Sequence, residues 1–245
     1  MKALILAAGY ATRMYPLTLN CPKALLPIGG GVMLDIIAGK IAEIPDIDEI
    51  VIVVNHRFYH MIKEWADKFS ANVKVTVLDD GTSSETDRLG AVGDIVYAID
   101  NGNMDDDLLI MACDNLFTFG LTDFYGFFSE RSADCVCAGI MENSEEIKRY
   151  GVIEADGEGN ILSFVEKPEK PRTDLAAYAI YMYKRETLPL FSRYLSENRG
   201  GDSPGKFLEW LCGVKKVCAY RFSGECFDIG TIPAYEEACR YFCVM

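Results

Sequence analysis

The sequence predicts an α/β fold built around a mainly parallel β-sheet. Over about the first 140 residues, apolar runs alternate with amphipathic stretches. Strands separated by helical segments of about 10–15 residues are typical of βαβ units. Polar residues follow the ends of several apolar runs, which is where ligands bind in such sheets. Beyond Met141 the runs shorten and are separated by glycine- and proline-containing turns, so we expect a second, β-rich part there.

Each element of the first part is expected from its hydrophobic pattern. Short, nearly continuous apolar runs predict buried strands at residues 2–6, 50–55, 73–78, 108–112 and 135–140. Apolar residues at helical spacing predict helices near residues 33–44, 59–69, 87–99 and 121–130. The polar stretch 79–93 is expected to be a loop leading into the third helix, with an N-cap among Thr82, Ser83 and Ser84.

The second part is expected to hold shorter strands and three helices. Strands are predicted at residues 150–154, 161–165, 176–183 and 217–222, and helices at 185–195, 204–211 and 233 to about 242. Ser203 followed by Pro204 is typical of a helix start, because serine accepts from free N–H groups and proline fits the first turn. The tyrosines of the strand 176–183 are expected to pack in the core, with one of them lining a pocket.

Composition excludes several kinds of partner. The chain of 245 residues has 24 Lys and Arg against 37 Asp and Glu, a formal net charge of −13. No basic run interrupts this acidity, which argues against nucleic acid or an anionic membrane as a partner. No apolar stretch approaches the ~20 residues of a membrane-spanning helix, and no signal-peptide pattern precedes the first strand. Nine cysteines without a CxxC pair indicate reduced thiols, so we expect a cytoplasmic protein.

The stretch 4–28 carries the first candidate site. Its apolar run ends in a loop of small residues that lets a ligand approach the backbone N–H groups: Ala7, Ala8, Gly9 and Ala11. Thr12 and Arg13 follow in the loop, and Lys23 lies just before the next apolar run. Two cations and free amides suit a polyphosphate. By itself the pattern also fits a glycine-containing connection with two solvated charges.

Asp114 is the second candidate. It follows the apolar run LLIMAC, at the end of an expected central strand. In an acidic protein with clustered cations, a carboxylate at this place is a plausible Mg²⁺ ligand. Asp-Asn also favours a helix N-cap or an Asx-turn, and the residues themselves leave both interpretations open.

The stretch LAAGYATRMYPLTLNCPKALLPI resembles the signature of the sugar-1-phosphate nucleotidyltransferases (nucleoside-diphosphate-sugar pyrophosphorylases), roughly LAGGxGTRLxPLTxxxPKxLLPV. Further motifs follow in the family's order: Cys113-Asp114-Asn115, Tyr150-Gly151-Val152, Val165-Glu166-Lys167-Pro168 and Asp228-Ile229-Gly230-Thr231. In the first motif alanines replace two glycines, Met14 replaces a leucine and Ile28 a valine. In the later motifs Cys113 replaces a glycine and Cys226 a tryptophan. The chain is similar to the glucose-1-phosphate thymidylyl- and uridylyltransferases of this family.

The resemblance implies a Rossmann-like, three-layer α/β/α fold with a mixed, mainly parallel central sheet and a smaller acceptor-binding β subregion. It covers nearly the whole chain, so we expect a single nucleotidyltransferase domain over residues 1–245. About 1–140 would be the nucleotide-binding half, and about 141–245 the acceptor-binding half with a C-terminal helix. Apolar, cysteine-containing helices near the C-terminus make a homo-oligomer an expected possibility.

The resemblance also implies an activity: Mg²⁺-dependent transfer of a nucleotidyl group from an NTP to a phosphorylated small-molecule acceptor, a sugar 1-phosphate first of all. The implied catalytic residues are Arg13, Lys23, Asp114 and Asp228, the two aspartates also holding the metal. The implied substrate-binding residues are Ala8, Gly9, Thr12, Arg88 and Gly90 for the nucleotide, and Gly151, Glu166 and Lys167 for the acceptor.

Three other functions are compared with the sequence. A cytidylyltransferase for a phosphocholine-like acceptor shares the opening motif and would need an aromatic cage, for which Tyr178, Tyr181 or Trp210 are candidates. A non-catalytic regulatory subunit would be expected to lose the metal aspartates or the phosphate-binding cations, and all of them are present. An NAD-dependent dehydrogenase requires G-x-G-x-x-G, but the stretch 9–14 lacks two of the three glycines.

Overall fold

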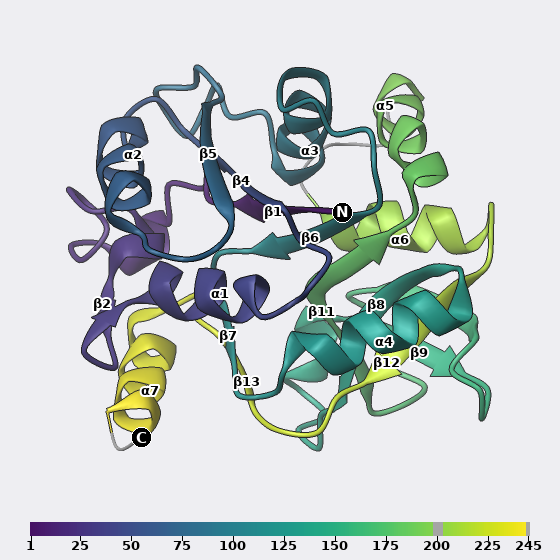
Figure 1. Cartoon of the computed structure of the whole chain (residues 1–245). Helices are drawn as coiled ribbons and strands as arrows, with labels where there is room; N and C mark the ends of the chain where they lie inside the picture. Colours follow the sequence, from purple (N-terminus) through teal and green to yellow (C-terminus); the bar gives the residue numbers. More distant parts are fainter. Residues whose placement is uncertain (198–202, 244–245) are drawn as a thin grey trace.

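The structure, a computed structural model, describes residues 1–197 and 203–243. At its centre is a nine-stranded sheet (Figure 1). Seven of its strands follow one another in the order β10-β9-β11-β6-β1-β4-β5, while β8 pairs with both β11 and β12. The bounds of the sheet strands are β1 Lys2–Leu6, β4 Glu49–Val54, β5 Lys74–Asp79, β6 Leu108–Ala112, β8 Asp134–Ile140, β9 Gly151–Ala155, β10 Ile161–Glu166, β11 Leu175–Tyr183 and β12 Val217–Arg221.

The sheet is mixed and mainly parallel, as expected. β1 pairs in parallel with β4 and β6, and β4 with β5. β11 runs antiparallel to β6, β8 and β9, and β12 runs parallel to β8. Together with the antiparallel pair of β9 and β10, this leaves only β10 and β11 reversed among the nine strands. The α/β fold class is therefore confirmed.

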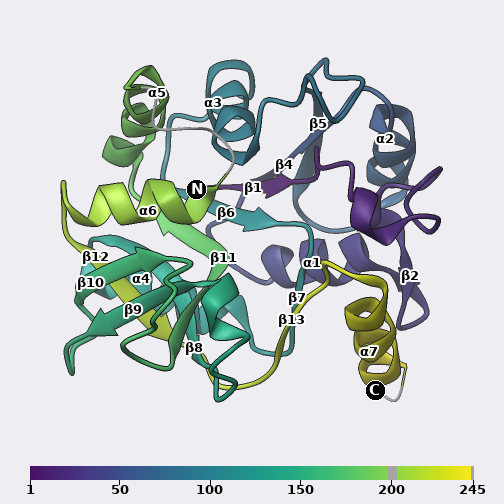
Figure 2. The ribbon, with the colours of Figure 1, turned by 180° about the vertical axis from the view of Figure 1, so that it is seen from behind.

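Helices cover both faces of the sheet, because successive strand residues point to opposite sides. In β1, Ala3 and Ile5 belong to the core cluster that also contains apolar residues of α1, α2 and α4, whereas Leu4 belongs to the cluster of α3, α5 and α6. α1 and α4 lie in front in Figure 1, and α6 lies in front in Figure 2. The bounds of these helices are α1 Met33–Ala42, α2 Tyr59–Lys68, α3 Ala91–Asn101, α4 Leu121–Arg131, α5 Leu188–Ser196 and α6 Pro204–Cys212.

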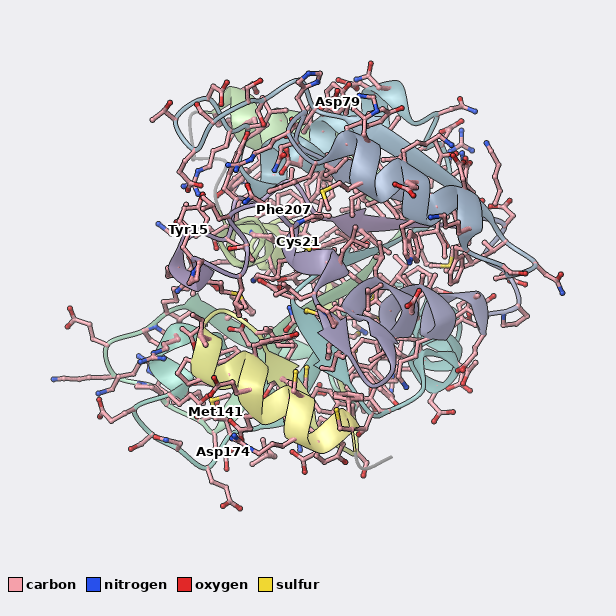
Figure 3. The ribbon with its side chains drawn as sticks, turned by 90° about the vertical axis from the view of Figure 1, so that its left-hand side faces the viewer. Tyr15, Cys21, Asp79, Met141, Asp174 and Phe207 are labelled. Atoms are coloured by element: carbon pink, nitrogen blue, oxygen red, sulfur yellow. The ribbon has the colours of Figure 1, made fainter. Side chains whose placement is uncertain are left out.

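The end of the chain returns to its beginning through small elements outside the main sheet. These are β2 Pro27–Ile28, β3 Gly31–Val32, β7 Asn115–Phe117, β13 Cys226–Asp228 and α7 Ile232–Phe242. β13 pairs antiparallel with β7, so that Asp228 lies opposite Asn115. α7 then packs on β2, where the Tyr235 hydroxyl donates to the Pro27 carbonyl oxygen. Figure 3 shows α7, in yellow, below the segment that carries Cys21.

The start of α3 differs from the expectation. The helix begins at Ala91 and not at Asp87, and none of the three hydroxyl residues expected as its N-cap caps it. The reason is local: the Asp87 carboxylate accepts from the backbone N–H groups of Ser83 (3.1 Å) and Ser84 (2.8 Å), which closes a separate turn. Gly90, with a φ of 77°, then redirects the chain into the helix.

Candidate active site

Two carbonyl oxygens of the loop after β1 accept hydrogen bonds from side chains, which fixes the conformation of the loop. The buried Asn55 side chain donates to the Ala8 carbonyl oxygen at 2.9 Å, and the Thr18 hydroxyl donates to the Ala11 carbonyl oxygen at 2.8 Å. A Cβ at Gly9 would meet no atom within 4 Å, so the loop faces open space there. Ala11 adopts the left-handed conformation (φ 48°) that leads into the 3-10 turn containing Thr12. The backbone is thus fixed in a shape that can surround an anion.

Two cations follow this loop. Lys23, which opens a second 3-10 turn, is nearly buried and forms an ion pair with Asp114 (Nζ–Oδ2 3.0 Å). Burial alone would lower the pKa of Lys23, but the carboxylates of Asp114 and Asp228 raise it, so the amine stays charged. The Arg13 guanidinium lies against Gly230, where a Cβ would be 3.3 Å from Nη2. No described residue forms an ion pair with Arg13, which leaves its charge available to a ligand.

Two aspartates that are far apart in the sequence, Asp114 and Asp228, meet beside these cations. Asp114 lies just before β7 and Asp228 at the end of β13, and the Ile229 N–H donates to the Asp114 carbonyl oxygen at 2.9 Å. The Asn115 amide donates to Asp114 Oδ1 at 3.0 Å and orients that carboxylate. Although Asp228 is open to the cavity, burial by the surrounding protein and the neighbouring Asp114 charge raise its pKa.

This donor set fits a hard divalent cation. Two adjacent carboxylates in a partly desolvated place repel each other, as the raised pKa of Asp228 shows, and a cation between them removes that cost. Within the described residues no group of three or more His, Cys, Asp or Glu side chains forms a complete metal site. Mg²⁺ is usually held by one or two carboxylates, waters and substrate phosphates, so two aspartates suffice.

One side of the site is built by the start of α3. Gly90, which precedes the helix, lines the cavity together with the loop after β1. Arg88 also lines the cavity and pairs with Glu85 (Nη1–Oε1 2.8 Å). The opposite side is built by β9, β10, β11 and α6.

On this opposite side Glu166 is held in place by α6. Its carboxylate is nearly buried and accepts from the Ser203 hydroxyl at 2.8 Å. Burial raises the pKa of Glu166, and the Ser203 hydrogen bond opposes that shift. Lys167 follows in the left-handed conformation (φ 51°), a strained backbone state that recurs at functional sites. Gly151 lies beneath the Phe164 ring, where any Cβ would collide with that ring.

All twelve predicted site residues line one cavity of about 480 Å³, a volume typical of small-molecule sites. They are Ala8, Gly9, Thr12, Arg13, Lys23, Arg88, Gly90, Asp114, Gly151, Glu166, Lys167 and Asp228. Four further residues line the same cavity although no motif pointed to them: Tyr10, Asp94, Phe164 and Gly205. Their only sequence signal is their nearness to the motifs. Tyr181 is the strand tyrosine that lines the cavity with Tyr150, as expected of one of them.

Some polar residues stay apart from the site. His56 is exposed and pairs with Asp79 (Nδ1–Oδ2 2.6 Å), and neither of them nor His60 lines the cavity. Asp79, labelled in Figure 3, is the last residue of the edge strand β5 and does not line the cavity. In the described parts of the chain, no helix has the length and apolar character needed to cross a membrane.

The chain is similar in sequence to known proteins over nearly its whole length. Residues 2–243 match the family described as nucleotidyl transferase. A protein of Sulfolobus acidocaldarius, proposed to be a mannose-1-phosphate guanyltransferase, is 32% identical over 240 residues, covering 96% of this chain and 61% of that protein. UTP–glucose-1-phosphate uridylyltransferase AglF of Haloferax volcanii is 26% identical over 239 residues, covering 97% of this chain and 95% of AglF.

The fold is shared with solved structures. A crystal structure from Bacillus anthracis, of a proposed glucose-1-phosphate thymidylyltransferase in complex with sucrose, has a TM-score of 0.85 to this chain at 22% identity, covering 100% of this chain and 96% of the other. Because the family match extends over residues 2–243 and the motifs meet in one cavity of the shared fold, this chain belongs to the nucleotidyl transferase family.

Proposed function

We propose that this protein transfers a nucleotidyl group from an NTP to a phosphorylated acceptor, releasing pyrophosphate, and that the acceptor is a sugar 1-phosphate. The observation that carries the proposal is the pairing of β7 with β13. It brings Asp114 and Asp228 together beside Lys23 and Arg13, in a cavity large enough for a nucleotide.

In this reaction an oxygen of the acceptor phosphate attacks the α-phosphorus of the NTP, and the bond to the leaving pyrophosphate breaks. The reacting groups carry four or more negative charges, so positioning and charge neutralisation dominate the catalysis. Arg13 holds the β- and γ-phosphates and stabilises the departing pyrophosphate. Lys23 lies beside Asp114, where the attacking and α-phosphates meet. A phosphate monoester is already ionised at neutral pH, so the attacking oxygen needs no general base.

The carboxylates of Asp114 and Asp228 would hold Mg²⁺. When bound, the ion supplies positive charge at the α-phosphate and at the leaving oxygen. The ion pair of Lys23 with Asp114 orients this carboxylate before substrates enter.

The acceptor side supports a polyhydroxyl ligand. The Glu166 carboxylate and the Gly151 backbone are suited to hold hydroxyl groups, while Lys167 is placed to hold the acceptor phosphate. The names of the two relatives above point the same way, since both contain a sugar 1-phosphate. These names differ in the nucleotide, so they leave the base open.

The phosphocholine-like alternative is less well supported. Of the three aromatic residues considered for a cage, only Tyr181 lines the cavity. Tyr178 packs against Tyr150 and Phe222, and Trp210 packs against Phe207. An aromatic cage for a quaternary ammonium is therefore not formed by these three residues.

The test is pyrophosphate release by the purified protein with Mg²⁺, with each NTP combined with each of a panel of phosphorylated sugars and of non-sugar phosphates. We expect release that requires one NTP and one sugar 1-phosphate. Release only with a non-sugar phosphate would replace the acceptor. Nucleotide binding without release for any pair would favour a regulatory subunit over an enzyme.

A further inference from the structure

One buried carboxyl group of the cavity has no role in the chemistry described above. Asp94 lies in the first turn of α3 and lines the cavity together with Ala8, Gly9 and Gly90. Asp94 is only 6% exposed, yet its Oδ1 is buried without a hydrogen-bond partner among residues 1–197 and 203–243. Buried polar groups in folded proteins are nearly always paired, so an unpaired carboxylate at a ligand cavity needs an explanation.

The residues around Asp94 do not supply the missing hydrogen-bond donor. The Asp80 charge repels Asp94. Asp80 Oδ1 accepts from the backbone N–H (2.7 Å) and hydroxyl (2.8 Å) of Thr82, and Asp80 Oδ2, like Asp94 Oδ1, is buried without a hydrogen-bond partner among the described residues, so Asp80 supplies no donor to Asp94. Burial, reinforced by Asp80 and opposed by Arg88, raises the pKa of Asp94 to about 7. A ligand that donates hydrogen bonds to Asp94 would remove this unfavourable state.

The position of Asp94 assigns it to one part of the nucleotide. Arg13 and Lys23 take the phosphates, and β9, β10, β11 and α6 take the acceptor on one side of them. Asp94 lies in the first turn of α3, where small residues line the cavity: Ala8, Gly9, Gly90 and Ala91. The nucleoside therefore lies against Asp94 when the phosphates are on the loop after β1.

We infer that Asp94 reads the nucleobase and that the base it selects is guanine. This inference rests on the proposed function. A carboxylate offers acceptors only, and guanine alone among the common bases presents two adjacent donors, N1–H and the 2-amino group, on its pairing edge. Uracil and thymine place N3–H between two carbonyl oxygens, and adenine and cytosine place the amino group beside a ring-nitrogen lone pair. Each of these edges sets a lone pair against the carboxylate.

The test is equilibrium binding of GTP, ITP, XTP, ATP, CTP, UTP and TTP, measured by calorimetry on the intact protein. ITP lacks the 2-amino group, so the wild-type protein should bind GTP roughly 10- to 100-fold more tightly than ITP, the range expected for a paired contact to a base edge. Asp94→Asn exchanges one acceptor for a donor and so matches xanthine, which carries a carbonyl at C2. This variant should bind XTP more tightly than GTP, whereas the wild type shows the opposite order.

The matched control is Asp100→Asn, on the same helix but exposed and outside the cavity, which should keep the wild-type order. Tighter binding of UTP, TTP, ATP or CTP than GTP, or equal binding of GTP and ITP, overturns the guanine inference. The proposed function survives that result if pyrophosphate release still depends on an NTP and an acceptor. Absence of binding and of release for every NTP overturns both. The wild-type comparison decides the matter even if Asp94→Asn does not fold.

Discussion

Among single residues, Asp114 and Asp228 contribute the most specific chemistry to the cavity. The Asn115 amide orients the Asp114 carboxylate, and the Ile229 N–H, which donates to the Asp114 carbonyl oxygen, ties the two segments together. The repulsion between the two carboxylates is partly offset by the charges of Lys23 and Arg13. We therefore expect a polyanion and a cation to bind this site together, and the cation to bind more weakly if one carboxylate is lost.

Asp114→Asn and Asp228→Asn should each lower the rate of pyrophosphate release by on the order of 10²-fold or more, because each removes charge that holds the cation. Steady-state kinetics at saturating Mg²⁺ measure this. Asp123→Asn, exposed on α4, is the control and should keep the wild-type rate. Near-normal turnover of both site variants would contradict the metal assignment.

Ser203 is a positioning residue for Glu166. Ser203→Ala removes one hydrogen bond to a nearly buried carboxylate, worth about 1–2 kcal/mol. We expect KM for the acceptor to rise roughly 5- to 30-fold, with KM for the NTP unchanged. Ser203→Thr keeps the hydroxyl and should restore the acceptor KM. An equal rise of both KM values would show a general structural effect and not positioning.

At the scale of elements, two helical glycines differ sharply in their surroundings. A Cβ at Gly205, in the first turn of α6, would collide with the Glu166 carboxylate, whereas a Cβ at Gly126, inside α4, would meet no atom within 4 Å. Gly205→Ala should displace Glu166 and weaken acceptor binding. Gly126→Ala should raise the free energy of unfolding by about 0.5–1 kcal/mol, since alanine favours a helix interior. Urea unfolding and acceptor titration compare the two, and a stabilising Gly205→Ala would contradict the close packing of α6 on Glu166.

Elements with continuous apolar runs are predictable from sequence, and elements fixed by distant partners are not. The strands expected at residues 2–6 and 108–112 coincide with β1 and β6, because runs buried on both faces leave little choice of register. β7 and β13 consist of three residues each and exist only because they pair with each other across more than a hundred positions of sequence. The predicted start of α3 at Asp87 is wrong because the Asp87 carboxylate stabilises a separate turn before the helix.

At the scale of the whole molecule, the end of the sheet away from the cavity is held by one carboxylate. Glu49, at the start of β4, contacts Lys2 of β1 (Nζ–Oε2 2.7 Å) and Lys74 of β5 (Nζ–Oε1 2.6 Å). Burial alone would raise the pKa of Glu49, but hydrogen bonds from Lys2, Lys74 and Thr76 lower it to about 2. One carboxylate thus links three neighbouring strands.

This link predicts a pH dependence of stability. Because the pKa of Glu49 is lower in the folded than in the unfolded chain, its contribution is complete above about pH 5 and is lost as the pH falls toward 2. The shift corresponds to about 3 kcal/mol at most. Glu49→Gln should lower the free energy of unfolding at pH 7 by about 1–3 kcal/mol, and the difference from wild type should shrink between pH 5 and pH 3. Urea unfolding at several pH values measures it, and a constant difference would contradict the assignment.

In the site, too, some residues are predictable from local sequence and others are fixed by distant partners. That the residues of the recognised motifs meet in one cavity could be predicted from the sequence, because the motifs have a fixed spacing and order. Asp94 and Gly205 could not, because what distinguishes them is a missing partner and a close contact, and neither has a sequence pattern. Ser203 was expected only as a helix N-cap. It occupies that position, but its hydroxyl binds Glu166 and does not cap the helix.

The pairing of β7 with β13 also bears on synthesis of the chain. Residues 2–117 contain the loop, both cations and the first aspartate, but the second aspartate is residue 228 of 245. During translation, the complete pair of carboxylates can therefore form only after β13 has been synthesised. A chain cut before β13 lacks Asp228, and we expect it to release no pyrophosphate.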